Sequence, residues 1–195
     1  KSEDNLLILN SPNNPSGQVC KNIEDLSKII IKYNITVLSD EIYSELTFNN
    51  EYKSLVELCP DNVIISNGLS KWCGAGGWRL GYFLIPEKLE LLKKSMKILA
   101  SETFSAVSAP IQYAAITAFK NNHSEYINKS KKILKSIGSF VFKNLNSNNI
   151  IMNEPMGGFY LMPEFLNKKF KTSSEMCSEI LNKTGVAILP GSDFG

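Results

Sequence analysis

Three short apolar runs, each followed by a turn of polar residues, constrain the fold of this chain most strongly. The runs cover residues 6–9, 35–38 and 63–65, and apolar residues recur at helical spacing over 22–33, between the first two runs. Short apolar runs are typical of strands covered on both faces, and a helix between such strands is typical of a right-handed crossover in a parallel sheet. We therefore predict an α/β fold built on a mainly parallel sheet with crossover helices.

A polar residue of interest follows each predicted strand, because Asn14, Asp40 and Lys71 come after the first, second and third apolar runs. Since parallel strands end at the same edge of their sheet, we expect these side chains to converge on one crevice, where open α/β sheets bind ligands. Taken singly, each has an ordinary explanation: Asn14 as a turn residue, Asp40 as a helix cap, and the nearby Tyr43 as a core aromatic with a wet hydroxyl. Their joint order favours a binding site.

Lys71 lies in the glycine-rich stretch Ser66–Gly81, and Arg79 follows it eight positions later. A partly desolvated lysine loses its proton more readily, and the neutral amine attacks a carbonyl carbon to form a Schiff base. Arginine binds phosphate through two parallel donors. The pair therefore favours a ligand that carries both an aldehyde and a phosphate, such as pyridoxal phosphate. The alternative is a surface lysine beside an arginine at a strand end.

The second half of the sequence is mostly helical in pattern. We predict helices near 86–99 and 110–119, a long lysine-rich helix over 124–144, and a helix over 173–183. We expect the lysines of the long helix to form a solvated face and its apolar residues to form a buried stripe. The stripe comprises Tyr126, Ile133, Leu134, Ile137, Phe140 and Val141.

Further strands are predicted after the long helix, as a pair at 150–152 and 159–162 and a single strand at 186–189. We place a domain change in the long helix. The predicted parts are a first domain at 1–120, a linking helix at 121–145 and part of a small α+β domain at 146–195.

The composition excludes several classes of function. The 195 residues include 21 basic and 19 acidic side chains with a net charge of +2, so we expect neither nucleic acid nor a membrane as partner. The four cysteines and the single histidine lack metal-ligand spacing, so we expect no metal, reduced thiols and a cytoplasmic location. Because the chain starts at Lys1 and stops in the turn 190–195, we expect a segment of a longer protein, and organelle targeting stays open.

Three motifs carry a family likeness, and they occur in the order Ser11-Pro-Asn-Asn-Pro-Ser-Gly17, Ser39-Asp-Glu-Ile-Tyr43, and Leu69-Ser-Lys71 with Gly77-Trp-Arg-Leu-Gly81. The chain resembles the class I/II aminotransferases, which are pyridoxal-phosphate enzymes of fold type I. The likeness continues through Gly157–Tyr160 and Pro190–Gly195, so it spans nearly the whole chain. It implies that residues 1–120 are the later part of the large cofactor-binding domain.

The resemblance implies a role for each matching residue. Lys71 would hold the aldehyde of pyridoxal 5′-phosphate as a Schiff base and then act as the base that moves a proton between the substrate α-carbon and the cofactor. Asp40 would keep the pyridinium nitrogen protonated, Asn14 and Tyr43 would donate hydrogen bonds to the ring's 3-oxygen, and Arg79 would hold the phosphate. The implied reaction transfers an amino group from an amino acid to a 2-oxo acid, in a homodimer whose sites are shared across the interface.

The sequence departs from the family at Gly68, where many members have a phosphate-binding serine three residues before the lysine. Carbon–sulfur β-lyases and aminocyclopropane-carboxylate synthases share the fold and the lysine, so a lyase is the alternative within the same cofactor class. A nucleotide-binding module is a third interpretation, although neither phosphate-loop glycine motif is present. A non-catalytic fragment that retains the fold is the fourth.

Overall fold

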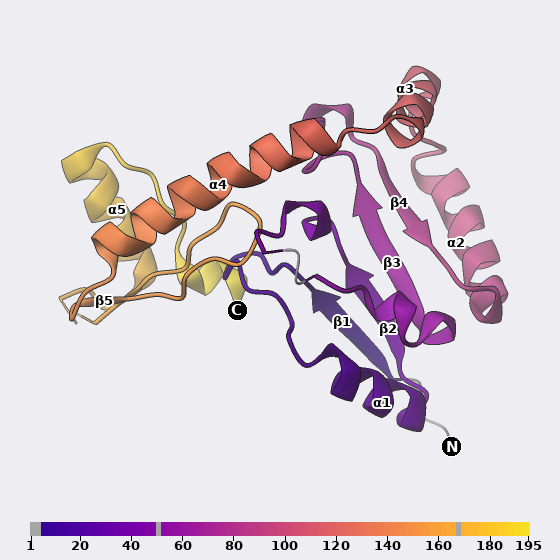
Figure 1. Ribbon diagram of the computed structural model, residues 1–195, viewed down its shortest axis with the longest axis horizontal. Helices are drawn as coiled ribbons and strands as arrows, with labels where there is room; N and C mark the ends of the chain where they lie inside the picture. The colour runs from indigo at the N-terminus through magenta and orange to yellow at the C-terminus, as the bar shows by residue number, and fades with distance from the viewer. Residues whose placement is uncertain (1–4, 50–51, 167–168) are drawn as a thin grey trace.

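The computed structural model describes residues 5–49, 52–166 and 169–195. Its centre is a four-stranded sheet in the order β1-β2-β3-β4 (Figure 1). The first three strands run parallel, and the fourth is antiparallel to the third. The predicted α/β fold with a mainly parallel sheet is therefore confirmed. The strands are β1 at Leu6–Asn10, β2 at Thr36–Asp40, β3 at Val63–Gly68 and β4 at Gly81–Leu84.

The connections between the strands differ in kind. Helix α1, at Ile23–Tyr33, crosses from β1 to β2 as predicted. From β2 to β3, the described chain forms the short 3-10 helices η1 at Ser44–Leu46, η2 at Leu55–Glu57 and η3 at Pro60–Asn62. Residues 69–80 connect β3 to β4 and include the 3-10 helix η4 at Gly76–Trp78, and β4 then returns antiparallel to β3.

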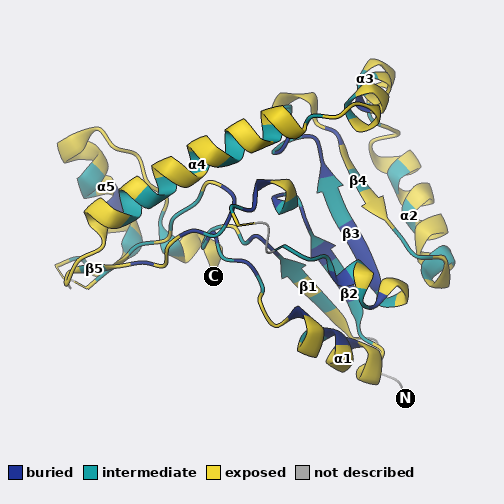
Figure 2. Ribbon diagram, in the orientation of Figure 1, coloured by how far each residue is buried: buried dark blue, intermediate teal, exposed yellow. Residues whose placement is uncertain are grey.

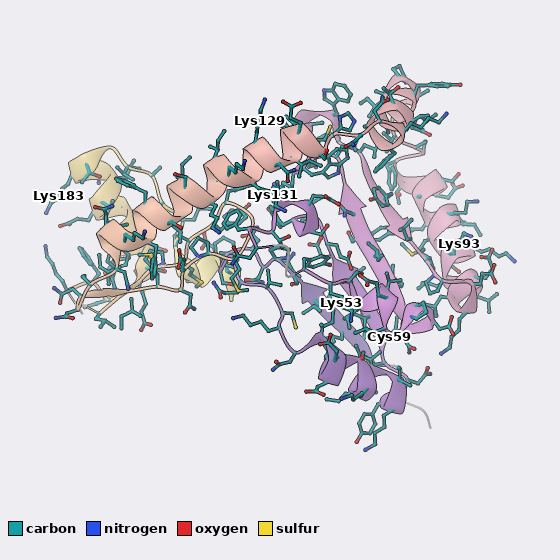
Figure 3. The ribbon with its side chains drawn as sticks, viewed as in Figure 1. Lys53, Cys59, Lys93, Lys129, Lys131 and Lys183 are labelled. Carbon is teal, nitrogen blue, oxygen red and sulfur yellow. The ribbon has the colours of Figure 1, made fainter. Side chains whose placement is uncertain are left out.

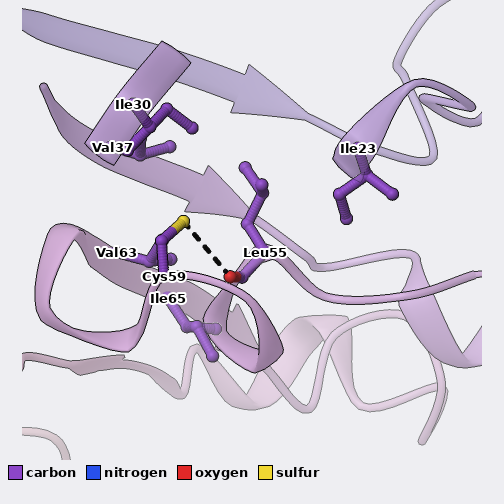
Figure 4. Packing of buried hydrophobic residues seen from close by; sticks show 7 residues of the cluster. All are labelled: Ile23, Ile30, Val37, Leu55, Cys59, Val63 and Ile65. Carbon is purple, nitrogen blue, oxygen red and sulfur yellow. Dashed lines mark hydrogen bonds between the residues drawn. The ribbon is translucent and has the colours of Figure 1, made fainter. Parts of the chain in front are cut away.

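The main core lies between α1 and the sheet. Ile30 on α1 and Val37 on β2 have no exposed surface, and burial of each such side chain stabilises the fold by about 1.5–3 kcal/mol. The Cys59 thiol donates a hydrogen bond of 3.4 Å to the carbonyl oxygen of Leu55 (Figure 4). All four cysteines are free. The core cluster contains Ile23, Ile30, Val37, Leu55, Cys59, Val63 and Ile65.

A second apolar cluster supports the turn that carries Lys71. Leu69 and Trp72, on either side of this lysine, are buried, and helix α3 at Ala109–Lys120 contributes Ala115 to the same cluster. The Trp72 ring lies 6.0 Å from that of Phe119, measured between ring centroids. The apolar side chains of the turn therefore anchor it in this cluster, next to helix α3.

Helices α2, at Glu90–Thr103, and α4, at Ser124–Leu145, form where they are predicted. The predicted buried stripe of α4 is wrong, because Ile133 is 59% exposed and Phe140 is 67% exposed, and Tyr126 and Ile137 are also exposed. Figure 2 shows α4 as a mixture of exposed and half-buried residues. The apolar periodicity identified a helix, but Leu134 and Val141 are only half-buried and the rest of the stripe is exposed.

The segment after α4 differs most from the prediction. Strand β5, at Ile150–Ile151, pairs with β6 at Glu164–Phe165, whereas the predicted second strand at 159–162 is not a strand. Helix α5, at Ser173–Thr184, forms as predicted and ends at Gly185 in the left-handed conformation. The strand predicted at 186–189 is irregular, because no described strand pairs with it. The division into 1–120, 121–145 and 146–195 stays a prediction.

The lysines of the helices lie on solvated faces. Lys129 on α4 pairs with Glu125 at 2.7 Å, and Lys183 on α5 pairs with Glu179 at 2.6 Å (Figure 3). Exposed pairs one helical turn apart contribute only about 0.3–0.5 kcal/mol each. The expected solvated face of α4 therefore agrees with these contacts. None of the helices in the described ranges is long and apolar enough to cross a membrane.

Candidate active site

The carboxyl ends of β1, β2 and β3 meet at one edge of the sheet. The Asn10 side-chain amide donates a hydrogen bond of 3.2 Å to the Asp40 carbonyl oxygen, and the Asn14 backbone N–H donates one of 2.7 Å to Asn10 Oδ1. Strand β3, which leads to Lys71, lies parallel beside β2. The three loops therefore leave the same edge, as predicted. The Asn14 side chain faces solvent.

Lys71 is half-buried, and its ammonium lies against two aromatic rings. Its Nζ is 5.4 Å from the ring centroid of Tyr43 and 5.3 Å from that of Phe159. The negative face of an aromatic ring attracts a cation by about 0.5–2 kcal/mol, depending on desolvation. These rings hold the amine of Lys71 near Tyr43. Asp40 lies close enough to Tyr43 for its charge to affect the pKa of that phenol.

Tyr43 is the most deeply buried of the predicted site residues, with 3% of its surface exposed. Its hydroxyl oxygen lies 2.8 Å from that of Tyr160, and the two rings meet edge to face at 5.6 Å between centroids. Burial raises the pKa of Tyr43 far above its ordinary value, and the hydrogen bond with Tyr160 and the nearby charge of Asp40 act in the same direction. Tyr43 is therefore a protonated hydrogen-bond donor at neutral pH.

Asp40 is half-buried at the end of β2. Burial raises the pKa of its carboxyl group, and the hydrogen bond of 3.3 Å from the Ile42 backbone N–H to Oδ1 partly opposes this effect. A carboxylate in this position gains stability from a cationic partner, because the partner compensates for lost hydration.

A buried polar network is centred on Glu41, the residue that follows Asp40. Oε1 of Glu41 accepts hydrogen bonds from the hydroxyls of Ser39 at 3.0 Å and Ser54 at 2.5 Å, although only 5% of Glu41 is exposed. Burial and the neighbouring Glu41 carboxylate also raise the pKa of Tyr52 well above its ordinary value. This network fixes the turn after β2 and so the direction of Asp40. Sequence reasoning missed it, because the spacing of these residues suggests no common contact.

The described hydrogen bond of the Arg79 side chain is made within its own turn. Arg79 is exposed, and its Nη1 donates a hydrogen bond of 2.8 Å to the Gly76 carbonyl oxygen. Its backbone has a left-handed φ of 57°. The side chain is long and bound only at the surface, so it can reorient toward an anion at the glycine-rich turn.

Phe159 and Tyr160 complete the cluster, although sequence reasoning gave them no individual role. They come from the segment after α4, and the ring of Phe159 lies 4.7 Å from that of Tyr160, measured between centroids. The signal for their importance was the Gly157–Gly158 turn directly before two aromatic residues. Glycines let the backbone approach other segments closely, and the aromatic rings then reach the sheet edge.

A cavity of about 630 Å³ borders the cluster, because Pro15, Phe159 and Tyr160 form part of its wall. Most of the remaining wall is apolar and comes from residues 161–165, helix α5 and residues 187–194. Within the described ranges, no group of three or more His, Cys, Asp or Glu side chains could hold a metal ion. The polar groups of the cluster are the amine of Lys71, the carboxyl group of Asp40 and the phenols of Tyr43 and Tyr160.

Comparison with known proteins gives consistent matches over the full chain. Residues 1–195 match the family model described as aminotransferase class I and II. An aspartate aminotransferase of Bacillus sp. (strain YM-2) is 33% identical over 200 residues, which cover 97% of this chain and 50% of that protein. The chain spans about half the length of the curated relatives it matches.

Solved structures agree with the same family. An alanine aminotransferase from Pyrococcus furiosus matches with a TM-score of 0.89 and 34% identity, over 100% of this chain and 51% of that chain. An aspartate aminotransferase from Thermotoga maritima matches with a TM-score of 0.84 and 29% identity, over 100% of this chain and 50% of that one.

Proposed function

Because the chain belongs to the class I and II aminotransferase family, we propose that its protein transfers an amino group from an amino acid to a 2-oxo acid. The cofactor is pyridoxal 5′-phosphate, and Lys71 is the residue that holds its aldehyde carbon. The observation that carries the proposal is the meeting of the Lys71 amine with Tyr43 at the strand edge that also carries Asp40. When bound, the cofactor supplies a ring that withdraws electrons from the substrate α-carbon.

The donor set fits this cofactor. The Lys71 amine lies over the rings of Tyr43 and Phe159. A bound planar cofactor ring can take the place of these ring contacts. The Asp40 carboxyl group has a pKa raised by burial, so a protonated ring nitrogen would supply the missing opposite charge. Tyr43 is a buried phenol that stays protonated, as a donor to the 3-oxygen must be. Asn14 would add a second donor, and Arg79 would bind the phosphate from the solvent side.

Each residue then has a defined task. Lys71 Nζ would take the proton from the substrate α-carbon and deliver it to the cofactor, which a neutral amine near the reacting carbon can do. Asp40 keeps a proton on the ring nitrogen by electrostatic attraction. Tyr43 directs its hydroxyl proton toward the 3-oxygen and stabilises negative charge there.

We also propose that the protein is a cytoplasmic homodimer. Support for a subunit interface comes from apolar residues that are exposed on three helices, including Leu91 at 81%, Tyr113 at 73% and Phe140 at 67%. Support for the cytoplasm comes from the four free cysteines. Sedimentation of the intact protein tests the first point, and localisation of a tagged protein tests the second.

The test of the proposed function is chemical trapping. The intact protein is mixed with pyridoxal phosphate, reduced with borohydride and mapped by mass spectrometry, and we expect the cofactor mass on Lys71. Lys71→Ala should lose both this label and amino transfer, whereas Lys129→Ala should keep both, because Lys129 is exposed and paired with Glu125. Labelling spread over surface lysines would contradict the proposal. Release of a 2-oxo acid without an added amino acceptor would instead support the lyase alternative.

A further inference from the structure

The contact between Tyr43 and Tyr160 joins two residues 117 positions apart in the chain. Their hydroxyl oxygens lie 2.8 Å apart, and either one could be the donor. A phenol has one proton to donate and lone pairs to accept with. If Tyr43 donates its proton to a cofactor, its oxygen can only accept from Tyr160. The pair then forms a chain of two hydrogen bonds with a fixed direction.

The backbone that carries Tyr160 is firmly held at this position. The N–H groups of Met156 and Gly157 donate to the Gly17 carbonyl oxygen at 2.8 and 3.1 Å, and the N–H of Gly158 donates to the Leu46 carbonyl oxygen at 3.1 Å. A Cβ atom on Gly157 would lie 2.9 Å from the Pro12 ring, so this approach depends on glycine. The Tyr160 hydroxyl is therefore presented to Tyr43 by a segment bound on two sides.

Tyr43 depends on this partner because of its burial. With 3% of its surface exposed, Tyr43 has little access to water as a substitute donor. In a chain of hydrogen bonds, a donor that itself accepts a hydrogen bond becomes more strongly polarised. A donor to the Tyr43 oxygen therefore strengthens whatever hydrogen bond Tyr43 makes with its own proton.

We propose that Tyr160 is a positioning residue, which donates its hydroxyl proton to Tyr43 and thereby directs the Tyr43 proton at the cofactor's 3-oxygen. This inference rests on the proposed function and deepens it. The stronger bond stabilises negative charge on the 3-oxygen. A better stabilised 3-oxygen attracts the nearby proton on Lys71 Nζ less, so that proton is lost at lower pH.

The variant Tyr160→Phe tests this inference with little change in packing, because it removes one hydroxyl and keeps the ring that contacts Tyr43 and Phe159. We expect cofactor affinity to fall roughly two- to tenfold, the effect of one hydrogen bond. The absorbance of the bound cofactor changes with pH as the proton on Lys71 Nζ is lost. The pH midpoint of this change should move upward by about half a pH unit. Unchanged affinity and an unchanged midpoint would overturn the inference.

A double-variant cycle decides whether Tyr160 acts through Tyr43. Tyr43→Phe alone should raise the midpoint further than Tyr160→Phe, and adding Tyr160→Phe to it should change nothing more. A further shift in the double variant would mean that Tyr160 acts independently, which contradicts the inference. Tyr33→Phe is the matched control, because Tyr33 is 60% exposed on α1, and it should leave the midpoint at the wild-type value.

A second substitution keeps the test decisive if Tyr160→Phe folds poorly. Replacement of Tyr160 by 3-fluorotyrosine keeps the hydroxyl and makes it a stronger donor, so the midpoint should move downward. An upward or absent shift would refute the donor role. If the cofactor still attaches to Lys71 in these variants but the midpoints do not move, the inference fails alone. If it does not attach to Lys71 in the wild-type protein, the proposed function fails as well.

Discussion

Replacement of Gly17 by alanine tests how the segment that carries Tyr160 is held. Gly17 has a left-handed φ of 68°, and a Cβ atom there would lie 2.8 Å from the backbone oxygen of Tyr160. The left-handed conformation costs a residue with a side chain about 1–2 kcal/mol. Overpacking of a fixed backbone costs about 1–3 kcal/mol more. We therefore expect Gly17→Ala to reduce the free energy of unfolding by about 2–5 kcal/mol.

The matched control is Gly185→Ala. Gly185 also has a left-handed φ, of 73°, but among the described residues no atom beyond its chain neighbours lies within 4 Å of the place a Cβ atom would take. Both variants have the same strain and the same loss of unfolded-state entropy. Their difference therefore reports the close contacts at Gly17, of which the one with the Tyr160 oxygen is the shortest, and we expect about 1–3 kcal/mol.

Urea unfolding of both variants and the wild-type protein measures this difference. With a urea dependence of about 2 kcal/mol/M, the midpoint of Gly17→Ala should lie about 0.5–1.5 M below that of Gly185→Ala. Fluorescence and circular dichroism should give the same midpoints, which supports a two-state analysis. Equal midpoints for the two variants would refute the claim that the Gly17 loop and the Tyr160 backbone are packed without spare room.

Two further predictions concern the sheet edge and the core. Asp40→Asn removes a carboxyl group whose pKa is raised in the folded state. Such a group binds its proton more tightly in the folded than in the unfolded protein, so its ionisation destabilises the fold as pH rises. The cofactor-free variant should therefore gain stability relative to the wild-type protein between about pH 3 and about pH 7, and a constant difference in urea unfolding over this range would contradict the effect of burial. Ile30→Ala should cost about 2–5 kcal/mol because Ile30 is fully buried. Ile31→Ala, at a position 57% exposed, should change stability by less than about 0.5 kcal/mol in the same denaturation assay.

The sheet could be predicted from the sequence because each strand and its end are specified by residues that are adjacent in the chain. An apolar run such as 63–65 followed by a glycine-rich turn specifies a buried strand and its end, and parallel pairing then aligns the ends. The run at 186–189 has the same apolar character but no strand beside it among the described residues, so its backbone stays irregular. A strand depends on its neighbour for hydrogen bonds, and one run cannot specify that neighbour.

The same limit applies to the helices and to the site. Periodicity located α4, but it could not tell whether Ile133 and Phe140 have anything to pack against. The loops that carry Asn14, Asp40 and Lys71 could be placed at one sheet edge because parallel strands order them. The contacts of Tyr43 with Tyr160 and of Lys71 with Phe159 could not, because they depend on where the chain returns after a helix of 22 residues.

This return makes the site a joint property of two distant parts of the chain. The segment after α4 is held by the carbonyl oxygens of Gly17 and Leu46, which belong to the loops after β1 and β2. The same loops carry Asn14 and Tyr43. A ligand that binds only when these loops are ordered therefore also stabilises the docked position of the segment. Conversely, the hydrogen bonds that dock the segment hold the loops in the arrangement proposed to bind the cofactor, so the free energy of docking would contribute to the free energy of binding.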